Sequence, residues 1–225
     1  LMQSAVKFQQ DGYHDQTQSI FATAQLGWKS KLYLDVTGRV DWSSALAWTD
    51  TKSVAYPSVG VSAILTELLP IKNNVLTFLK VRGSYSEVGN APTRYIAYQT
   101  YPYESASPVT ATTYPNTDIK PERTKAWEVG LQSHLWNDKL ELNVSLYKTS
   151  TYNQLFNPSI SASSGYSSIY INGGQVDNKG IEASLTLNQP LGPVQWNSTF
   201  TYTINRNKIK KLLKPTTLSN GEVVK

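Results

Sequence analysis

The sequence has 225 residues, a formal net charge of +5 and no cysteine. The absence of cysteine excludes disulfide scaffolds and thiolate metal sites. Charged residues make up only 16% of the chain and aromatic residues 11%, a balance that disfavours disorder and suits a β-rich protein with one apolar and one polar face. Because Lys and Arg are scattered rather than gathered in a stripe, no nucleic-acid partner is predicted.

No apolar run approaches the ~20 residues that a transmembrane helix needs. The longest stretch, residues 59–65, is much shorter. The segment from Leu1 to Gln10 has neither the basic start nor the apolar core of a signal peptide. If the protein is exported, we expect its leader to lie outside this sequence.

Hydrophobic and polar residues alternate in segments of about ten residues, which is longer than the usual strand of a soluble domain. In the second segment, for example, Leu32, Leu34 and Val36 share one face. The segments predicted as strands are, in chain order, residues 17–28, 32–42, 59–65, 79–85, 129–135, 140–147, 181–187 and 196–204. The sequence therefore predicts an all-β fold of about eight strands, with a helical pattern only in the short 66–77 connection.

The connections between these strands alternate in length. They are short and rich in turn formers at residues 29–30, 137–138 and 190–193, and long at 43–53, 87–122, 152–176 and after 205. Soluble sandwiches rarely carry several structureless loops this long, whereas outer-membrane barrels combine short periplasmic turns with long extracellular loops. We therefore expect an antiparallel up-and-down transmembrane β-barrel segment.

Two tryptophans support this interpretation. Trp28 and Trp196 lie beside short turns on the apolar side of their strands, where the aromatic girdle of a membrane barrel is expected. Trp136 also adjoins a turn, but it has the opposite parity, so it requires a local bulge or packs against the turn. The alternative for all three is an ordinary core tryptophan.

Four charged residues alternate with the apolar rows and are predicted to face an aqueous lumen: Arg39, Asp41, Arg82 and Glu182. We expect them to pair with one another or with a plug, a structural role rather than substrate binding. The mixture of Thr, Asn, Ser and charge on this face suits a wet lumen. A secreted β-sandwich would also accommodate it.

Five stretches carry a family resemblance. They are residues 38–44 (GRVDWSS), 56–62 (YPSVGVS), 79–85 (LKVRGSY) followed by Gly89-Asn90, 119–124 (IKPERT) and 178–182 (NKGIE). In this order they resemble elements of the SusC/RagA-type TonB-dependent transporters, and 79–90 resembles the most specific of these elements. Trp42 stands where that family usually has Gly.

The resemblance implies a bacterial outer-membrane barrel of ~22 strands closed around an N-terminal plug. Residues 1–225 are then interpreted as one part of that barrel domain, surrounded by outer-membrane lipids, with the plug and the remaining strands absent from this chain. It further implies TonB as the partner that supplies energy through an N-terminal region, and a SusD-like surface lipoprotein that caps the loops. The expected function is import of a glycan or oligopeptide nutrient; the alternatives are a passive porin and a secreted β-sandwich adhesin.

Catalytic chemistry is not predicted. His14 and His134 are the only histidines, and neither a metal-ligand spacing, a Gly-x-Ser-x-Gly motif nor a phosphate-binding loop is present. We therefore expect no enzyme activity, no metal site and no cofactor.

The candidate binding residues are the tyrosines of the longest loop, Tyr95, Tyr98, Tyr101 and Tyr103. Further tyrosines follow at Tyr114 and, around the next long loop, at Tyr152, Tyr166 and Tyr170. A tyrosine offers a flat apolar face and a hydroxyl, which suits stacking on a sugar ring or clamping a peptide. The alternative is that these rings pack the loop or contact a lid protein.

Overall fold

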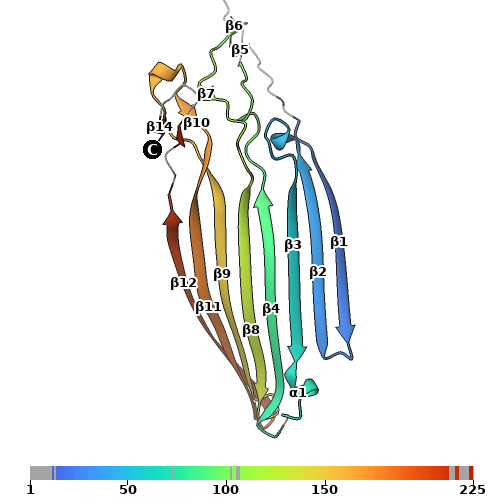
Figure 1. The fold of residues 1–225 in the computed structure, drawn as a ribbon. Helices are drawn as coiled ribbons and strands as arrows, with labels where there is room; N and C mark the ends of the chain where they lie inside the picture. The colour runs from blue at the N-terminus through green and yellow to red at the C-terminus, as the bar shows by residue number, and fades with distance from the viewer. Residues whose placement is uncertain are drawn as a thin grey trace, which may run out of the picture.

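A computed structural model describes Gly12 and residues 14–71, 73–101, 103–104, 107–212, 216–217 and 223–224. The fold is one antiparallel sheet in the order β1-β2-β3-β4-β8-β9-β11-β12 (Figure 1). Its strands are β1 Thr17–Trp28, β2 Leu32–Ser43, β3 Val54–Ile64, β4 Leu76–Asn90, β8 Glu122–Leu135, β9 Leu140–Phe156, β11 Ile171–Leu191 and β12 Val194–Lys211. The predicted eight-stranded meander is confirmed.

The connections between the long strands contain short helical turns and short strands. The helical turns are η1 Ser44–Leu46, α1 Leu65–Leu68 and η2 Ala162–Ser164. Three short two-stranded sheets pair β5 (Tyr103–Glu104) with β6 (Ser107–Pro108), β7 (Thr113–Tyr114) with β10 (Ser168–Ile169), and β13 (Thr216–Thr217) with β14 (Val223–Val224). In the part of the chain described above, no helix has the length and hydrophobicity required to cross a membrane.

The short turns adopt left-handed backbone conformations. Lys29 and Ser30 both have positive φ, 49° and 55°, and they are the central residues of a tight turn in which the N–H of Lys31 donates to the carbonyl of Trp28 at 2.9 Å. At the next short turn Trp136 itself has a φ of 51° and lies in the turn. The parity conflict predicted for Trp136 therefore disappears, because strand alternation ends at Leu135.

The structure corrects two predicted boundaries. The helical connection shrinks to the four residues of α1, because Pro70 cannot continue a helix. The long connections also start later and end earlier than predicted: β4 continues to Asn90 and β9 to Phe156. Near the loop end of the sheet, both faces of a strand meet a polar environment. The alternation of apolar and polar residues therefore fades there, although the backbone hydrogen bonds between strands continue.

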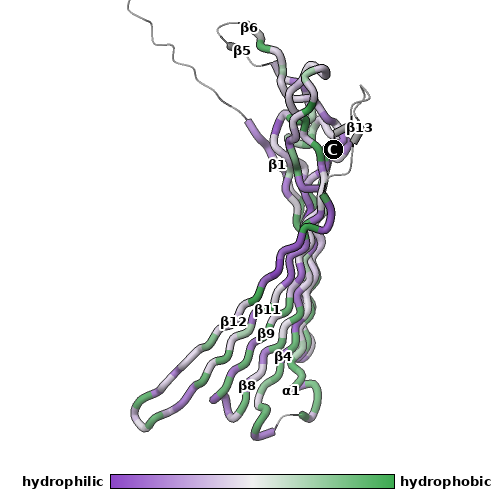
Figure 2. Tube along the Cα trace, turned by 90° about the vertical axis from the view of Figure 1, so that its left-hand side faces the viewer, coloured by the Kyte–Doolittle hydropathy of each residue, from purple (hydrophilic) through white to green (hydrophobic). Residues whose placement is uncertain are grey.

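The sheet is a single curved layer (Figure 2). The cross-strand register places Leu34, Val61 and Gly83 in one row on one face, and Tyr33, Ser62 and Arg82 in one row on the other. Large apolar side chains of the first face remain exposed, with Val61 and Leu146 both at 50%. No described element covers this face as a second sheet would, which agrees with an apolar side that contacts lipid.

The buried hydrophobic residues lie instead at the loop end of the sheet. They are Leu46, Val54, Ile96, Ala97, Ala111, Ile119, Ile169 and Ile171. Ile169 and Ile171 form a small core, against which Tyr114, Phe156 and Ile160 pack. The packed interior of the described chain therefore stabilises the long connections rather than the sheet.

Candidate substrate-capture loops and polar wall

Three long connections meet above the sheet and form one loop cluster, defined here as the described residues 44–53, 91–101, 103–104, 107–121 and 157–170. The first two are joined by the backbone of Asp50, whose N–H donates to the carbonyl of Thr117 at 3.2 Å. The second and third are joined by the parallel pairing of β7 with β10. The loop cluster is thus an ordered platform held by backbone hydrogen bonds.

Asn172, at the start of β11, ties the loop cluster to the sheet. Its side-chain oxygen accepts from the N–H of Lys120 at 2.6 Å, and its side-chain nitrogen donates to the carbonyl of the same residue at 2.8 Å. The side chain of Asn172 thus forms the two hydrogen bonds with the backbone of Lys120 that a residue of a neighbouring strand would form. The same nitrogen also donates to the carbonyl of Asn153 at 2.9 Å, so one side chain joins β9, β11 and the loop cluster.

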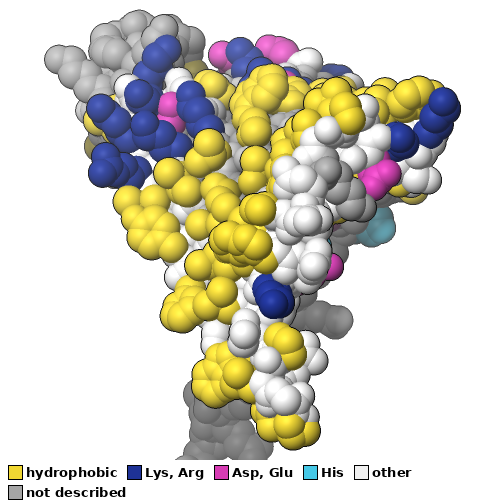
Figure 3. Space-filling view, turned by 90° about the horizontal axis from the view of Figure 1, so that it is seen from below, with side chains coloured by type: hydrophobic (Ala, Val, Ile, Leu, Met, Phe, Trp, Pro, Cys, Tyr) yellow, Lys and Arg dark blue, Asp and Glu magenta, His cyan; other side chains and the backbone are white. Residues whose placement is uncertain are grey.

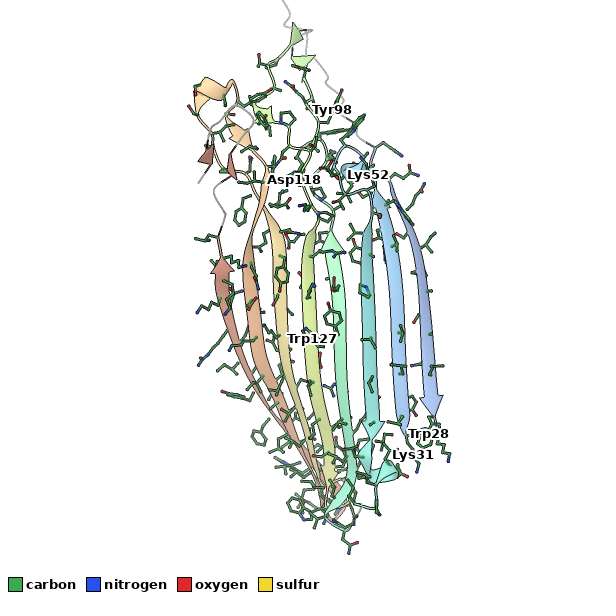
Figure 4. All side chains as sticks on the ribbon, in the orientation of Figure 1. Trp28, Lys31, Lys52, Tyr98, Asp118 and Trp127 are labelled. Carbon is green, nitrogen blue, oxygen red and sulfur yellow. The ribbon has the colours of Figure 1, made fainter. Side chains whose placement is uncertain are left out.

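The predicted tyrosines lie on this platform but do not form one continuous surface. Tyr98 stacks on Trp48 with ring centroids 4.7 Å apart and planes 26° apart. Tyr95, Tyr98 and Tyr101 are all more than half exposed. Tyr103 lies in β5, and its side chain is outside the described ones. Figure 4 shows Tyr98 at the loop end, opposite the end that carries Trp28 and Lys31.

Two aromatic contacts extend across connections. Trp48, from the first connection, was missed by the sequence analysis, although a tryptophan in a loop at the same end of the sheet is a usable signal. Tyr114 meets Tyr166 edge to face at 5.2 Å, which joins the second connection to the third. Tyr98 and Trp48 together offer an exposed aromatic pair, whereas Tyr114 and Tyr166 strengthen the platform.

The polar face of the sheet is organised around Arg82. Its guanidinium donates to Ser145 Oγ at 2.6 Å and to Asn143 Oδ1 at 3.3 Å, and it lies 3.5 Å from Glu128 Oε1. To reach β9 the side chain crosses Gly130 of β8, where an added Cβ would lie 2.6 Å from the guanidinium carbon. A glycine at this position therefore makes room for a bridge across three strands.

Glu182 lies on the same face in β11, opposite Ser145. Together with Glu128 and Ser145 it lines a hollow of about 320 Å³. Arg39 and Asp41 form an ion pair at 2.6 Å nearer the loop end of β2. The four predicted charges thus share the polar face, but they form separate groups: Arg82 reaches Glu128 and not Glu182.

A further ionic group was not predicted. Glu87 lies 3.3 Å from Lys125 and 3.7 Å from Arg123 and accepts a hydrogen bond from Tyr85. The pairing depends on the register between β4 and β8, which a single sequence does not specify across so long a connection. Among the described residues, no group of three or more His, Asp or Glu side chains is placed to hold a metal ion.

Comparison with known proteins decides the family. The family model described as "TonB dependent receptor-like, beta-barrel" matches residues 3–222. The chain belongs to this family of outer-membrane transporters. It is 29% identical over 220 residues to TonB-dependent receptor P3 of Formosa agariphila, covering 92% of this chain and 22% of that protein. TonB-dependent receptor P26 of the same organism is 28% identical over 208 residues. The chain thus spans about a fifth of the length of these relatives.

Solved structures agree with this assignment. The structure titled "Structure of the RagAB peptide transporter" matches with a TM-score of 0.75 and 25% identity, over 88% of this chain and 22% of that one. The "open-open" state of the RagAB peptide importer matches with a TM-score of 0.78 at 24% identity, over 91% of this chain and 23% of that one. The predicted resemblance to SusC/RagA-type transporters, the barrel fold and the outer-membrane location are confirmed. The family is one of transporters and not of enzymes.

Proposed function

We propose that this chain forms part of the barrel wall and extracellular loops of an energy-coupled importer. The observation that carries the proposal is the family match over nearly the whole chain, on a sheet with an apolar face, a polar face and one ordered loop end. In this proposal residues 1–225 belong to a larger barrel domain that also holds a plug. TonB supplies energy from the periplasm, and the chain carries no catalytic machinery.

The proposed cargo is an oligopeptide or glycan nutrient, captured beneath a SusD-like surface lipoprotein. The RagAB structures, whose titles describe a peptide transporter and importer, support the peptide class and a two-component assembly. An aromatic pair such as Tyr98 and Trp48 suits either cargo, because it stacks on sugar rings and packs against peptide side chains. Arg39, Asp41, Arg82 and Glu182 are proposed to line the lumen and brace the plug.

The exposed tyrosines provide the test. In the full-length transporter, Tyr98→Ala/Tyr101→Ala is expected to weaken capture about tenfold, because each ring contributes roughly 0.5–1.5 kcal/mol of stacking. Tyr202→Ala is the matched control, since Tyr202 is equally exposed but lies on the apolar face of β12. Uptake of a labelled oligopeptide and of a labelled oligosaccharide is measured in cells, with and without a protonophore.

The outcomes separate the alternatives. Energy-dependent uptake that falls in the double variant but not in Tyr202→Ala supports both the importer and the tyrosine assignment. Unchanged affinity and uptake in the double variant would show that the rings only pack the loop cluster. Uptake that continues in the presence of the protonophore would indicate a passive porin instead.

A further inference from the structure

On the apolar face, the hydrophobic residues of β8, β9, β11 and β12 give way to Lys or Arg toward the loop end of the sheet. The register places the last apolar residues Leu146 of β9, Ile181 of β11 and Ile204 of β12 in one row. Two residues closer to the loops, the same face carries Lys148, Lys179 and Arg206. On β8 that row holds Trp127, and Lys125 follows two residues further toward the loops. On β4 the corresponding residue, opposite Lys125, is the acid Glu87. The positive charge is therefore local to one side of the sheet.

Three of these cations face one another directly. Lys148 is paired with Lys179 in the β9–β11 register, and Lys179 with Arg206 in the β11–β12 register. Like charges directly opposite each other on one face of a sheet repel and destabilise it. Such an arrangement calls for a counter-charge close by.

The described residues supply only part of that counter-charge. Lys125 has Glu87 at 3.3 Å, and Lys148 has Asp177 at 3.7 Å. Within the described part of the chain, no ion pair joins Lys179 or Arg206 to an acid. Among the described residues, the β11–β12 end of the row thus keeps excess positive charge that a bound anion would balance.

Directly below the cations lies a shallow groove of about 520 Å³ with an apolar floor. Lys148, Lys179 and Arg206 form its upper rim, and Val129, Leu146 and Ile181 belong to its floor. We call these six residues the basic groove. Figure 3 shows Lys and Arg side chains gathered beside a hydrophobic surface on the side of the sheet where β12 lies.

The height of the rim matches a lipid head-group. A barrel strand crosses the hydrocarbon layer in about 9–11 residues. On β9, residues 140–148 run from the short turn to Lys148, which places the rim where the outer leaflet passes from acyl chains to phosphate. Trp127 lies opposite Lys148, as expected for an aromatic residue at a membrane boundary.

We propose that the basic groove binds a phosphorylated glycolipid of the outer leaflet. The phosphate accepts hydrogen bonds from Arg206 and lies against the ammonium groups of Lys148 and Lys179, while an acyl chain covers Val129, Leu146 and Ile181. The planar guanidinium of Arg can donate two parallel hydrogen bonds to a phosphate, and the ammonium of Lys provides a compact positive charge. The site faces the membrane rather than the lumen, so it is independent of the imported cargo.

The test uses the full-length transporter in non-ionic detergent and monophosphoryl lipid A as the probe, with bound lipid counted by native mass spectrometry. Lys148→Gln/Lys179→Gln/Arg206→Gln is expected to weaken retention by about fivefold for each cation removed. The matched control is Lys29→Gln/Lys80→Gln/Lys139→Gln, which removes equal charge at the short-turn end and on the polar face. The single variant Lys179→Gln serves if the triple variant does not fold.

Dephosphorylated lipid A and inorganic phosphate are the comparison probes. Retention of the phosphorylated lipid by the wild type and the control, with loss in the triple or single variant, supports the proposal. Equal retention by the variants overturns it. So does equal retention of the dephosphorylated lipid, which would leave only the apolar floor, or binding of inorganic phosphate without the lipid, which would indicate a simple anion site.

Discussion

At the scale of single residues, glycines determine where a long side chain can lie across a neighbouring strand. Gly130 is buried because the Arg82 side chain lies over it. Gly180 plays a similar role beneath Tyr147, where an added Cβ would lie 2.5 Å from the tyrosine hydroxyl and from the carbonyl of Ile204. Each glycine makes room for a polar side chain that reaches a neighbouring strand on the polar face. Side chains therefore stabilise the sheet in addition to its backbone hydrogen bonds.

Gly130→Ala should therefore destabilise the wall in the full-length protein. The new methyl group displaces the Arg82 guanidinium from Ser145 and Asn143, which costs about 1.5–3 kcal/mol for hydrogen bonds to a charged group. Gly83→Ala is the control, because its added Cβ meets only the Glu128 carbonyl, at an ordinary 3.9 Å. The midpoint temperature of the folded band in heat-modifiability gels measures the difference.

A second substitution separates the bridge from general strain. In an Arg82→Met background the guanidinium is already gone, so the further cost of Gly130→Ala should shrink. A cost that stays the same in both backgrounds would mean that the glycine acts through the backbone and not through Arg82.

At the scale of elements, what could be predicted depended on how local the signal was. Alternation within each strand predicted the eight long strands, and turn formers located the three short turns. The extension of β9 to Phe156 was not predictable, because the alternation fades there while the pairing with β11 continues. The Glu87 group was not predictable, because it depends on the register of β4 with β8 across a long connection. For the candidate site, the tyrosine-bearing loops were found by composition. The partner of Tyr98 was not, because Trp48 comes from another connection.

Asn172→Ala should loosen the loop cluster without unfolding the sheet. The substitution removes two hydrogen bonds to Lys120 and one to Asn153, each contributing about 0.5–1.5 kcal/mol. Faster hydrogen exchange and proteolysis are expected in residues 91–121, with exchange in the long strands unchanged. Asn188→Ala, which removes bonds to Asp138 and Glu141 at the opposite end, should leave the loops protected. Equal protection in both variants would contradict this anchoring role.

At the scale of the whole molecule, the sheet has two separate edges. β1 and β12 lie at opposite ends of the strand order, and no described strand pairs with their outer sides. All residues of β1 are exposed. Unpaired edges of this length are templates for pairing with other chains, and a barrel removes them only by closing. We therefore propose that further strands of a larger barrel pair beside β1 and β12.

Refolded alone into detergent micelles, the 225-residue chain should consequently fail to give a single monomeric species, whereas the full-length transporter should give one. In the isolated chain, the free N–H and C=O groups of β1 and β12 pair with other copies, since hydrocarbon cannot satisfy them. Size-exclusion chromatography with light scattering distinguishes the two states. A monodisperse, heat-modifiable monomer of the isolated chain would instead mean that eight strands close on themselves. The polar face would then enclose an interior only wide enough for its own side chains, and the proposed place of this sheet in a larger barrel would be wrong.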